Sequence, residues 1–257
     1  MRLSIVTVCF NSEKTIQKCI ESVLNAAENN FEYIIIDGKS SDLTLEIANS
    51  YVLPFRDKGI EYKIISEEDT GIYNAMNKAV LVAQGDWILF LNSDDYLYDK
   101  NSLTELMSNS ELDRYDVVYG DILVSFDNQL MLQKPRDLKR LKSGIEMPFC
   151  HQATFTKASV LRRFGFDEKY IIISDIDSFL RMYEAGLDFF YIPKIIAVFS
   201  NDGLSQTHRI ESIYEGKVLL KSHNCYSLDR ILDLNLRLLW YKIKKIVPYR
   251  LIKILRK

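Results

Sequence analysis

The first hundred residues alternate between short apolar runs and longer segments in which apolar residues recur every three or four positions. The runs are typical of buried strands, and they span residues 3–9, 31–36, 61–65 and 87–91. The segments between them are typical of amphipathic helices, with clear periodicity at Ile16, Ile20, Val23 and Leu24 and again over residues 72–83. Strands that alternate with helices across short loops predict an α/β fold, with a Rossmann-like, mostly parallel central sheet and helices on both faces.

The alternation breaks after Tyr98. Residues 115–124 and 129–133 predict a hairpin with its turn at Asp127 and Asn128. The later elements are predicted as helices near 157–164, 177–184 and 210–222 and short strands near 189–192 and 196–199. We expect this second half to extend the same sheet as a mixed sheet and to cover one end of it.

The C-terminal tail is basic and amphipathic. From residue 230 to 257 there are nine lysines and arginines and one aspartate, a charge of 9 − 1 = +8. The whole chain has a net charge of −2, so the rest of it carries −2 − 8 = −10. A helix kinked at Pro248 is predicted from about Asp229, because the following apolar residues lie three or four apart: Leu236, Leu239, Trp240, Ile243, Val247, Leu251 and Leu255. Such a helix suits an anionic membrane surface, and its apolar face would equally suit packing on the rest of the chain or on a second subunit.

The composition excludes several classes of protein. With 47% apolar and 26% charged residues, the chain is that of a folded protein. The N-terminal apolar run ends at Asn11, so we expect a first strand and no targeting peptide. The four scattered cysteines favour reduced thiols in the cytosol. Three dispersed histidines disfavour a zinc site, and no glycine-rich dinucleotide motif or P-loop follows the first strand.

Polar residues follow two of the predicted strands at their carboxyl ends, which share one edge of a parallel sheet and commonly bind ligands there. Asp94 and Asp95 follow the fourth strand and suit a hard divalent cation, or else a turn or helix cap. Asp37 follows the second strand, where its carboxylate could accept a hydrogen bond from a bound base or shape an Asx-turn.

Two further stretches, both in the second half, carry candidates. In ISDIDSFLRM, Asp177 is placed to cap a helix, whereas Asp175 lies in the predicted approach loop and could act as a general base on a hydroxyl. His151 and Gln152 are secondary candidates, because a lone histidine is more often structural than catalytic.

Four stretches in register resemble family 2 glycosyltransferases with the GT-A fold, of the bacterial polysaccharide and O-antigen type. They are VTVCFNSEKTIQKCIESVL, YIIIDGKSSDLTLEIA, SEEDTGIYNAMNKAV and GDWILFLNSDDYLY. The resemblance is strong over about residues 3–100 and weaker over 146–205. It implies a catalytic domain over 1–225, with a nucleotide-sugar-binding half (1–100) and an acceptor-binding half (101–225), followed by the tail over 226–257.

The resemblance also implies roles for individual residues. Asp94, with Asp95 beside it, would bind Mn²⁺ or Mg²⁺ on the donor diphosphate, although Asn92 stands where the family usually has the first aspartate of this motif. Asp175 would be the catalytic base, in a stretch where Ser174 replaces the usual glutamate. His151 and Gln152 would contact the acceptor or the diphosphate. The residues implied in nucleotide-sugar binding are Thr7, Phe10, Asn11, Asp37, Lys78, Asn92 and Ser93.

The activity implied is inverting, metal-dependent transfer of a hexose or N-acetylhexosamine from a nucleotide sugar, with UDP as the expected nucleotide. The acceptor would be a polyprenyl-diphosphate-linked saccharide of O-antigen or lipopolysaccharide biosynthesis, and the tail would hold the enzyme at the cytoplasmic face of the inner membrane by its anionic lipids. No nucleic-acid partner is expected, and the oligomeric state stays open. The alternatives are a nucleotidyltransferase, which would need a basic, glycine-rich phosphate loop after the first strand, and a non-catalytic nucleotide-binding scaffold.

Overall fold

The computed structural model describes residues 2–27, 30–126, 129–200 and 207–246 of the 257-residue chain. The first half consists of β1 (Leu3–Cys9), α1 (Ile16–Leu24), β2 (Phe31–Asp37), α2 (Thr44–Ser50), α3 (Val52–Asp57), β3 (Glu61–Ser66), α4 (Ile72–Val82) and β4 (Trp87–Phe90). The strands and helices that follow are β5 (Tyr96–Leu97), α5 (Thr104–Ser108), β6 (Val117–Phe126), β7 (Gln129–Gln133), β8 (Thr154–Lys157), α6 (Ala158–Phe164), α7 (Ser174–Glu184), β9 (Phe189–Ser200), α9 (Arg209–Ser222) and α10 (Leu228–Ile246). Three short 3-10 helices complete the description: η1 (Ser110–Arg114), η2 (Leu138–Ser143) and η3 (His151–Ala153).

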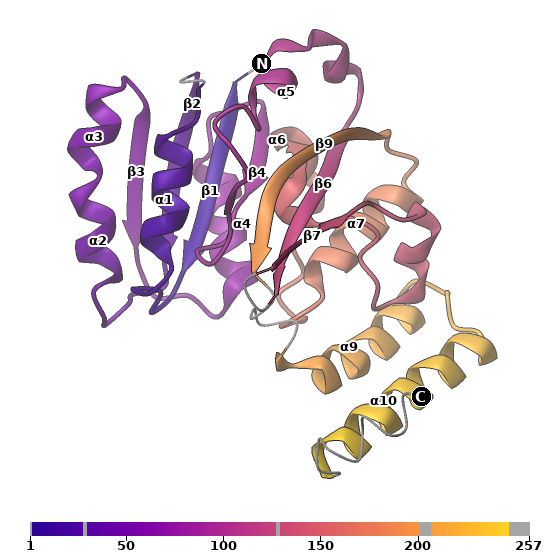
Figure 1. The fold of residues 1–257 in the computed structure, drawn as a ribbon. Coiled ribbons are helices and arrows are strands. Elements are labelled where there is room, and N and C mark those ends of the chain that lie inside the picture. The colour runs from indigo at the N-terminus through magenta and orange to yellow at the C-terminus, as the bar shows by residue number, and fades with distance from the viewer. Residues whose placement is uncertain (1, 28–29, 127–128, 201–206, 247–257) are drawn as a thin grey trace.

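One sheet runs through both halves of the chain (Figure 1). Its strand order is β3-β2-β1-β4-β8-β6-β9-β5, with β7 paired to β6. The first four strands are parallel, whereas β8 is antiparallel to both β4 and β6. This confirms the predicted α/β fold and the predicted mixed extension of the sheet by the second half.

The alternation of side chains along β1 explains why helices cover both faces. Leu3 and Ile5 point into a core that they share with α1, α2 and α3. Val6 and Val8 point to the opposite face, into a second core with α4, α6 and α7. Every residue of β1 is buried, as expected for a central parallel strand.

The register of the parallel strands places the predicted polar turns at one edge. Cys9 pairs with Asp37, and Asp37 pairs with Ser66, at the carboxyl ends of β1, β2 and β3. Phe90 of β4 pairs with Val6 of β1, so the turn that follows β4 emerges at the same edge. We call this edge the rim, and its formation confirms the expectation from the sequence.

Three local predictions were wrong. The two short strands predicted near 189–192 and 196–199 form one strand, β9, whose pairing with β6 shifts register around Asp121. Pro193 has no N–H to donate to the ladder, which disrupts the pairing there. A Cβ at position 120 would lie 2.7 Å from the carbonyl oxygen of Lys194, so the glycine lets the two strands stay close across the irregularity. The short elements α3, α5, β5 and β8 were not predicted, and Lys157 ends β8 instead of starting a helix. The predicted hairpin turn at 127–128 lies outside the described residues.

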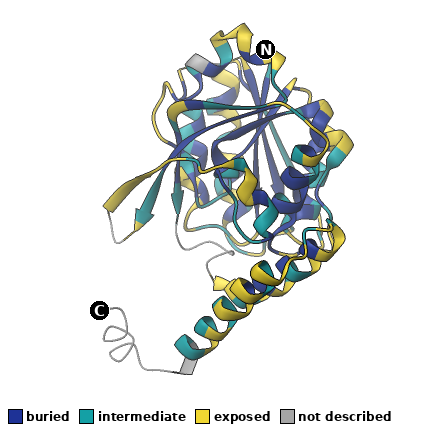
Figure 2. Cartoon of the chain, turned by 90° about the vertical axis from the view of Figure 1, so that its right-hand side faces the viewer, coloured by how far each residue is buried: buried dark blue, intermediate teal, exposed yellow. Residues whose placement is uncertain are grey.

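The last two described helices, α9 and α10, pack together below the sheet (Figure 2). Leu234 of α10 is buried against Ile213 and Leu220 of α9, whereas Leu236 and Leu239 are more than half exposed. The helix predicted from Asp229 is therefore present as α10, and the predicted kink at Pro248 lies outside the described residues. Within residues 2–246, as far as they are described, no helix is long and apolar enough to cross a membrane.

Candidate functional site

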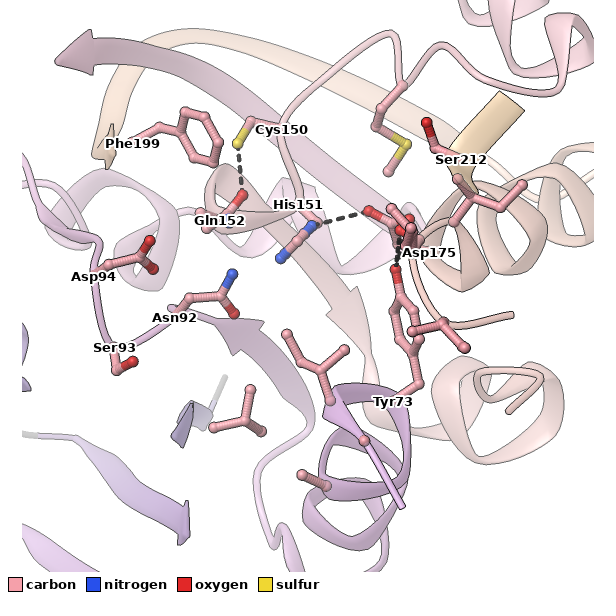
Figure 3. Close-up of a pocket in the computed structure, with 18 of the residues that line it drawn as sticks. Tyr73, Asn92, Ser93, Asp94, Cys150, His151, Gln152, Asp175, Phe199 and Ser212 are labelled. Atoms are coloured by element: carbon pink, nitrogen blue, oxygen red, sulfur yellow. Dashed lines mark hydrogen bonds and ion pairs between the residues drawn. The ribbon is translucent and has the colours of Figure 1, made fainter. Parts of the chain in front are cut away.

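A cleft of about 1100 Å³ opens at the rim (Figure 3). Its walls come from segments that are far apart in the sequence. They include the loop after β1, the start of α4, the turn Asn92–Asp94, parts of β6 and β7, the segment around η3, the approach to α7, and the facing sides of α9 and α10. The cleft therefore joins the two halves that the sequence analysis assigns to donor and acceptor.

The loop after β1 reaches the cleft through two of the three residues predicted there. Phe10 is 62% exposed, and Asn11 adopts a left-handed conformation with φ of 49°. The side-chain oxygen of Asn11 accepts a hydrogen bond of 3.0 Å from the backbone N–H of Ser41, which ties this loop to the one after β2. Thr7 is fully buried beneath the cleft, 2.9 Å from the hydroxyl of Tyr33, so its side chain supports the strand.

Asp37 and Lys78 do not belong to the described lining of the cleft. The buried carboxylate of Asp37 accepts hydrogen bonds from the backbone N–H of Ser40 at 3.0 Å and from the hydroxyl of Ser66 at 2.7 Å. The first contact holds the loop after β2 and the second ties it to the end of β3, so both are structural contacts of the carboxylate. Lys78 on α4 pairs with Glu67 at 2.8 Å. Their predicted contacts with the nucleotide stay predictions.

The turn after β4 divides its two carboxylates between two environments. Asp94 lines the cleft with Asn92 and Ser93, whose hydroxyl donates to that of Ser12 at 2.9 Å. Asp95 is 1% exposed, and one of its oxygens accepts from the backbone N–H of Ser200 at 2.8 Å. Burial, together with the neighbouring Asp94 carboxylate, raises the pKa of Asp95 well above its usual range. Of the predicted metal pair, Asp94 is therefore the one placed to meet a ligand.

The residues at this turn suit a divalent cation shared with a substrate. Asn92 Oδ1 is buried and has no hydrogen-bond partner among the described residues, and an amide oxygen is a ligand that Mn²⁺ and Mg²⁺ accept. The described residues contain no cluster of three or more histidines, cysteines or acids that could enclose a metal ion. That pattern fits Mg²⁺ sites that use one or two carboxylates plus the phosphates of a substrate.

Asp175 lies on the opposite wall. The sequence analysis predicts that Asp175 lies in a loop and that Asp177 opens the helix after it. The predicted start of this helix is wrong, because α7 begins at Ser174 and both aspartates lie in its first turn. The physical reason is a distant contact: the Glu215 carboxylate of α9 accepts hydrogen bonds of 2.7, 3.0 and 3.2 Å from the three consecutive N–H groups that precede the helix. Asp177 turns away from the cleft toward Arg181 and His223.

The carboxylate of Asp175 is held by donors from three segments. Its Oδ1 accepts from the N–H of Ile176 at 2.8 Å. The hydroxyl of Tyr73 lies 3.1 Å from the same oxygen and 2.7 Å from the carbonyl oxygen of Ile172, so the two acceptors share its one proton. Its Oδ2 lies 3.1 Å from Nδ1 of His151, and the two side chains are 14% and 18% exposed. Burial, followed by the charge of Asp175, raises the pKa of Tyr73 well above its usual range, so the hydroxyl stays a donor.

Gln152 is buried beside His151 on η3. Its carbonyl oxygen accepts a hydrogen bond of 2.7 Å from the thiol of Cys150, and both residues line the cleft. Burial raises the pKa of the Cys150 thiol far above its usual value, so it stays protonated as the donor. His151, Gln152 and Asp175 all line the cleft, and the predicted contacts of His151 and Gln152 with the acceptor or the diphosphate stay predictions.

Sequence reasoning missed several residues of the site. Tyr73 stands within the stretch SEEDTGIYNAMNKAV that carries the resemblance, which was the one available signal for it. Arg209, Ser212, Arg237 and Tyr241 line the cleft from α9 and α10, and no local pattern indicated that these helices reach it.

Residues 4–188 match the family model described as "Glycosyl transferase family 2". Among curated proteins, the chain is similar to the PGL/p-HBAD biosynthesis glycosyltransferase of Mycobacterium bovis, with 30% identity over 208 residues that cover 79% of each protein. The matched residues include the rim and both walls that carry Asp94 and Asp175.

Solved structures show the same fold. TarS of S. aureus (residues 1–349), in complex with UDP-GlcNAc, gives a TM-score of 0.66 at 20% identity over 85% of this chain. The mannosyltransferase PcManGT of Pyrobaculum calidifontis, in complex with GDP-Man and Mn²⁺, gives 0.63 at 16% identity over 83% of this chain. The matches span 66% and 61% of those two chains.

Proposed function

The chain belongs to glycosyl transferase family 2, has the GT-A fold and is a glycosyltransferase, and from this premise we propose the following reaction. The enzyme transfers a hexose or N-acetylhexosamine, with inversion, from a UDP-sugar to a polyprenyl-diphosphate-linked saccharide of cell-surface polysaccharide biosynthesis, such as O-antigen. The neighbour crystallised with UDP-GlcNAc supports UDP as the nucleotide.

The observation that carries this proposal is the pairing of two unlike walls in one cleft. Asp94 and Asn92 line the wall at the rim, and Asp175 with His151 lines the wall at α7. Inverting transfer needs both: charge compensation for a leaving nucleoside diphosphate, and a base that takes the proton from the attacking hydroxyl on the other side of the anomeric carbon. We assign residues 1–100 to the donor and residues 101–225 to the acceptor on this basis.

Metal dependence is supported by the charge of the cleft. Its described lining contains more acidic residues than lysines and arginines. The acids are Glu13, Asp42, Asp69, Asp94 and Asp175, and the bases are Lys14, Arg209 and Arg237. A diphosphate would be repelled by this excess of carboxylates, since like charges across a binding site oppose association. Asp94, with the amide oxygen of Asn92, would hold Mn²⁺ or Mg²⁺, which compensates the negative charge of the diphosphate when bound.

The acceptor proposed is lipid-linked, and the tail supports a peripheral location at the cytoplasmic face of the inner membrane. Leu228, Leu232, Leu236 and Leu239 lie exposed along α10, which also carries several of the basic residues of the tail. An amphipathic helix of this kind binds anionic lipid surfaces.

The proposal is tested by incubating the purified chain with a panel of UDP- and GDP-sugars, Mn²⁺ and a lipid-linked saccharide, and measuring the release of nucleoside diphosphate. Turnover that EDTA abolishes and Mn²⁺ restores is expected. Asp94→Asn should weaken UDP binding in Mn²⁺ by about 10–100-fold, because a metal ligand is lost. Asp57→Asn on α3, outside the described lining, is the matched control and should bind UDP normally. Turnover that is indifferent to EDTA would reject the metal assignment, and no turnover with any donor would reject the reaction.

A further inference from the structure

The side chain of Glu215 on α9 binds three consecutive backbone N–H groups of the segment that leads into α7. Its Oε1 accepts from Ile171 at 2.7 Å, and its Oε2 accepts from Ile172 at 3.0 Å and from Ile173 at 3.2 Å. Ile173 stands at the N-cap of α7 and has no polar side chain that could cap the helix. A carboxylate at this end of a helix also meets the positive end of the helix dipole. Glu215 therefore gives α7, from a distant helix, the anchor that its own sequence lacks.

The segment that Glu215 holds, residues 171–173, is the backbone support of Asp175. We call it the approach segment, and all three of its residues line the cleft. The hydroxyl of Tyr73 lies 2.7 Å from the carbonyl oxygen of Ile172 and 3.1 Å from Oδ1 of Asp175. The approach segment is thus held from α9 through its N–H groups and from α4 through a carbonyl group. Because a single residue separates it from Asp175, a shift of this backbone would move the carboxylate of Asp175 with it.

The place from which Glu215 reaches the approach segment is set by the close packing of α9. A Cβ at the next residue, Gly216, would lie 2.7 Å from the carbonyl oxygen of Gly144, so the glycine lets α9 press against that backbone. At the C-terminal end of α9, His223 bonds Asp177 of α7 at 3.1 Å. These two contacts hold α9 against the wall of the cleft, and the carboxylate of Glu215 is held with it.

Glu215 itself does not belong to the described lining of the cleft. We infer that it is a positioning residue, which acts on the reaction through Asp175. The inference rests on the proposed glycosyl transfer, in which the acceptor oxygen forms its bond to the anomeric carbon while its proton passes to Asp175. The bond from that carbon to the diphosphate oxygen breaks, and the nucleoside diphosphate leaves with the electron pair. Glu215 keeps the approach segment in the arrangement that presents the Asp175 carboxylate to the attacking hydroxyl.

The first variant that tests this role is Glu215→Gln, which keeps the size of the side chain but replaces one accepting oxygen with an NH2 group that only donates. Its kcat should fall by about 10–100-fold, the scale of loss when a catalytic group is misplaced, while the KM for the UDP-sugar stays within about threefold. UDP binding in Mn²⁺ verifies that the variant is folded. Glu215→Asp, whose carboxylate is one methylene shorter of the approach segment, takes its place if Glu215→Gln does not bind UDP, and should lose at least about fivefold in kcat.

A double substitution separates positioning from a purely structural effect. If Glu215 acts through Asp175, the substitution at Glu215 should change kcat by less than about threefold in an Asp175→Asn enzyme, because the group that it positions is already lost. A structural role would lower the kcat of both enzymes by the same factor. Transfer from a radiolabelled UDP-sugar measures the low rates of the Asp175→Asn enzymes.

The matched control is Glu211→Gln, one helical turn earlier on α9, because Glu211 is exposed and lies outside the described lining of the cleft. Its kcat should stay within about twofold of the wild type, as is usual for a surface substitution. A Glu215 variant that binds UDP and keeps a kcat within about threefold of the wild type would overturn the inference alone, as would an equal loss with and without the Asp175 carboxylate. A wild-type enzyme that is inactive with every donor would overturn the proposed function, and the inference with it.

Discussion

At the scale of single residues, Asp175 is the point where donors from α4, η3 and α7 converge. We predict that Asp175→Asn lowers kcat by about 10²–10⁴-fold, because a neutral amide cannot take the proton of the attacking hydroxyl as a carboxylate can. The KM for the donor should change little, since Asp175 lies on the wall away from Asp94. Steady-state kinetics at saturating acceptor measures both constants.

Asp167→Asn provides the control for this substitution, because Asp167 lies in the loop before α7 and pairs with Lys169 at 2.6 Å outside the described lining. It should leave kcat unchanged. If Asp175→Asn turns over at a near-normal rate while it binds UDP normally, Asp175 has no part in the reaction.

The sequence indicates which residues lie near the cleft better than it indicates where their side chains point. Phe10, Asn92, Asp94 and His151, which the sequence analysis singles out, line the cleft, and their roles there stay predictions. Thr7 does not line the cleft, because it lies inside β1, two residues before the strand ends, and is fully buried. The contact of Tyr73 with Asp175 spans 102 positions of sequence, and no local periodicity reports a pairing of that kind.

At the scale of elements, the parallel half was predictable because each of its strands is a buried apolar run between amphipathic helices. The second half was less so. β8 has four residues and β5 has two, too few for a periodicity to appear, and the pairing of β6 with β9 depends on a local irregularity at Gly120 and Pro193. The start of α7 depends on Glu215, which lies more than forty residues later in the chain.

The junction between α7 and the end of α9 contains a titratable contact. His223 bonds Asp177 at 3.1 Å and Glu184 at 2.7 Å, while Arg181 holds the other oxygen of Asp177. These carboxylates, Asp177 first, raise the pKa of His223. A raised pKa in the folded state means that its stabilisation is complete below the unfolded value of about 6.5 and is lost as the pH rises through the folded value.

We therefore predict that His223→Gln lowers the free energy of unfolding by about 1–3 kcal/mol at pH 5.5, and by less at pH 9, because the charged hydrogen bond exists only when His223 is protonated. Urea denaturation of both proteins at the two pH values measures the difference. A difference that is the same at both values would show that the ionisation of His223 does not stabilise the junction.

At the scale of the whole molecule, α9 and α10 do two things at once. Their inner sides complete the cleft with Arg209, Ser212 and Tyr241. Their shared core of Ile213, Leu220 and Leu234 fastens α10 to α9, so the sequence alternative of packing on the chain itself applies to one side of the tail helix. Leu232, Leu236 and Leu239 on the same helix are exposed, and the proposed membrane contact would use these residues.

The exposed side of α10 gives the membrane proposal its sharpest test. Leu232, Leu236 and Leu239 are 60%, 57% and 55% exposed, so replacing all three with serine leaves the contact with α9 intact. Each leucine that leaves water halfway contributes about 1 kcal/mol, so binding to vesicles that contain anionic lipid should weaken by about 100-fold. Vesicle cosedimentation measures this loss, and the melting temperature should change little.

The matched control is a double substitution to serine at Leu130 and Leu132 of β7, each 52% exposed, on the hairpin that projects from the sheet. It removes exposed leucines from a surface without the basic residues of α10, so vesicle binding should persist. If the α10 triple variant sediments with anionic vesicles as the wild type does, the tail helix is not the anchor. If both variants lose binding equally, the attachment is a general property of exposed leucines, and the combination of leucine and positive charge on α10 has no special role.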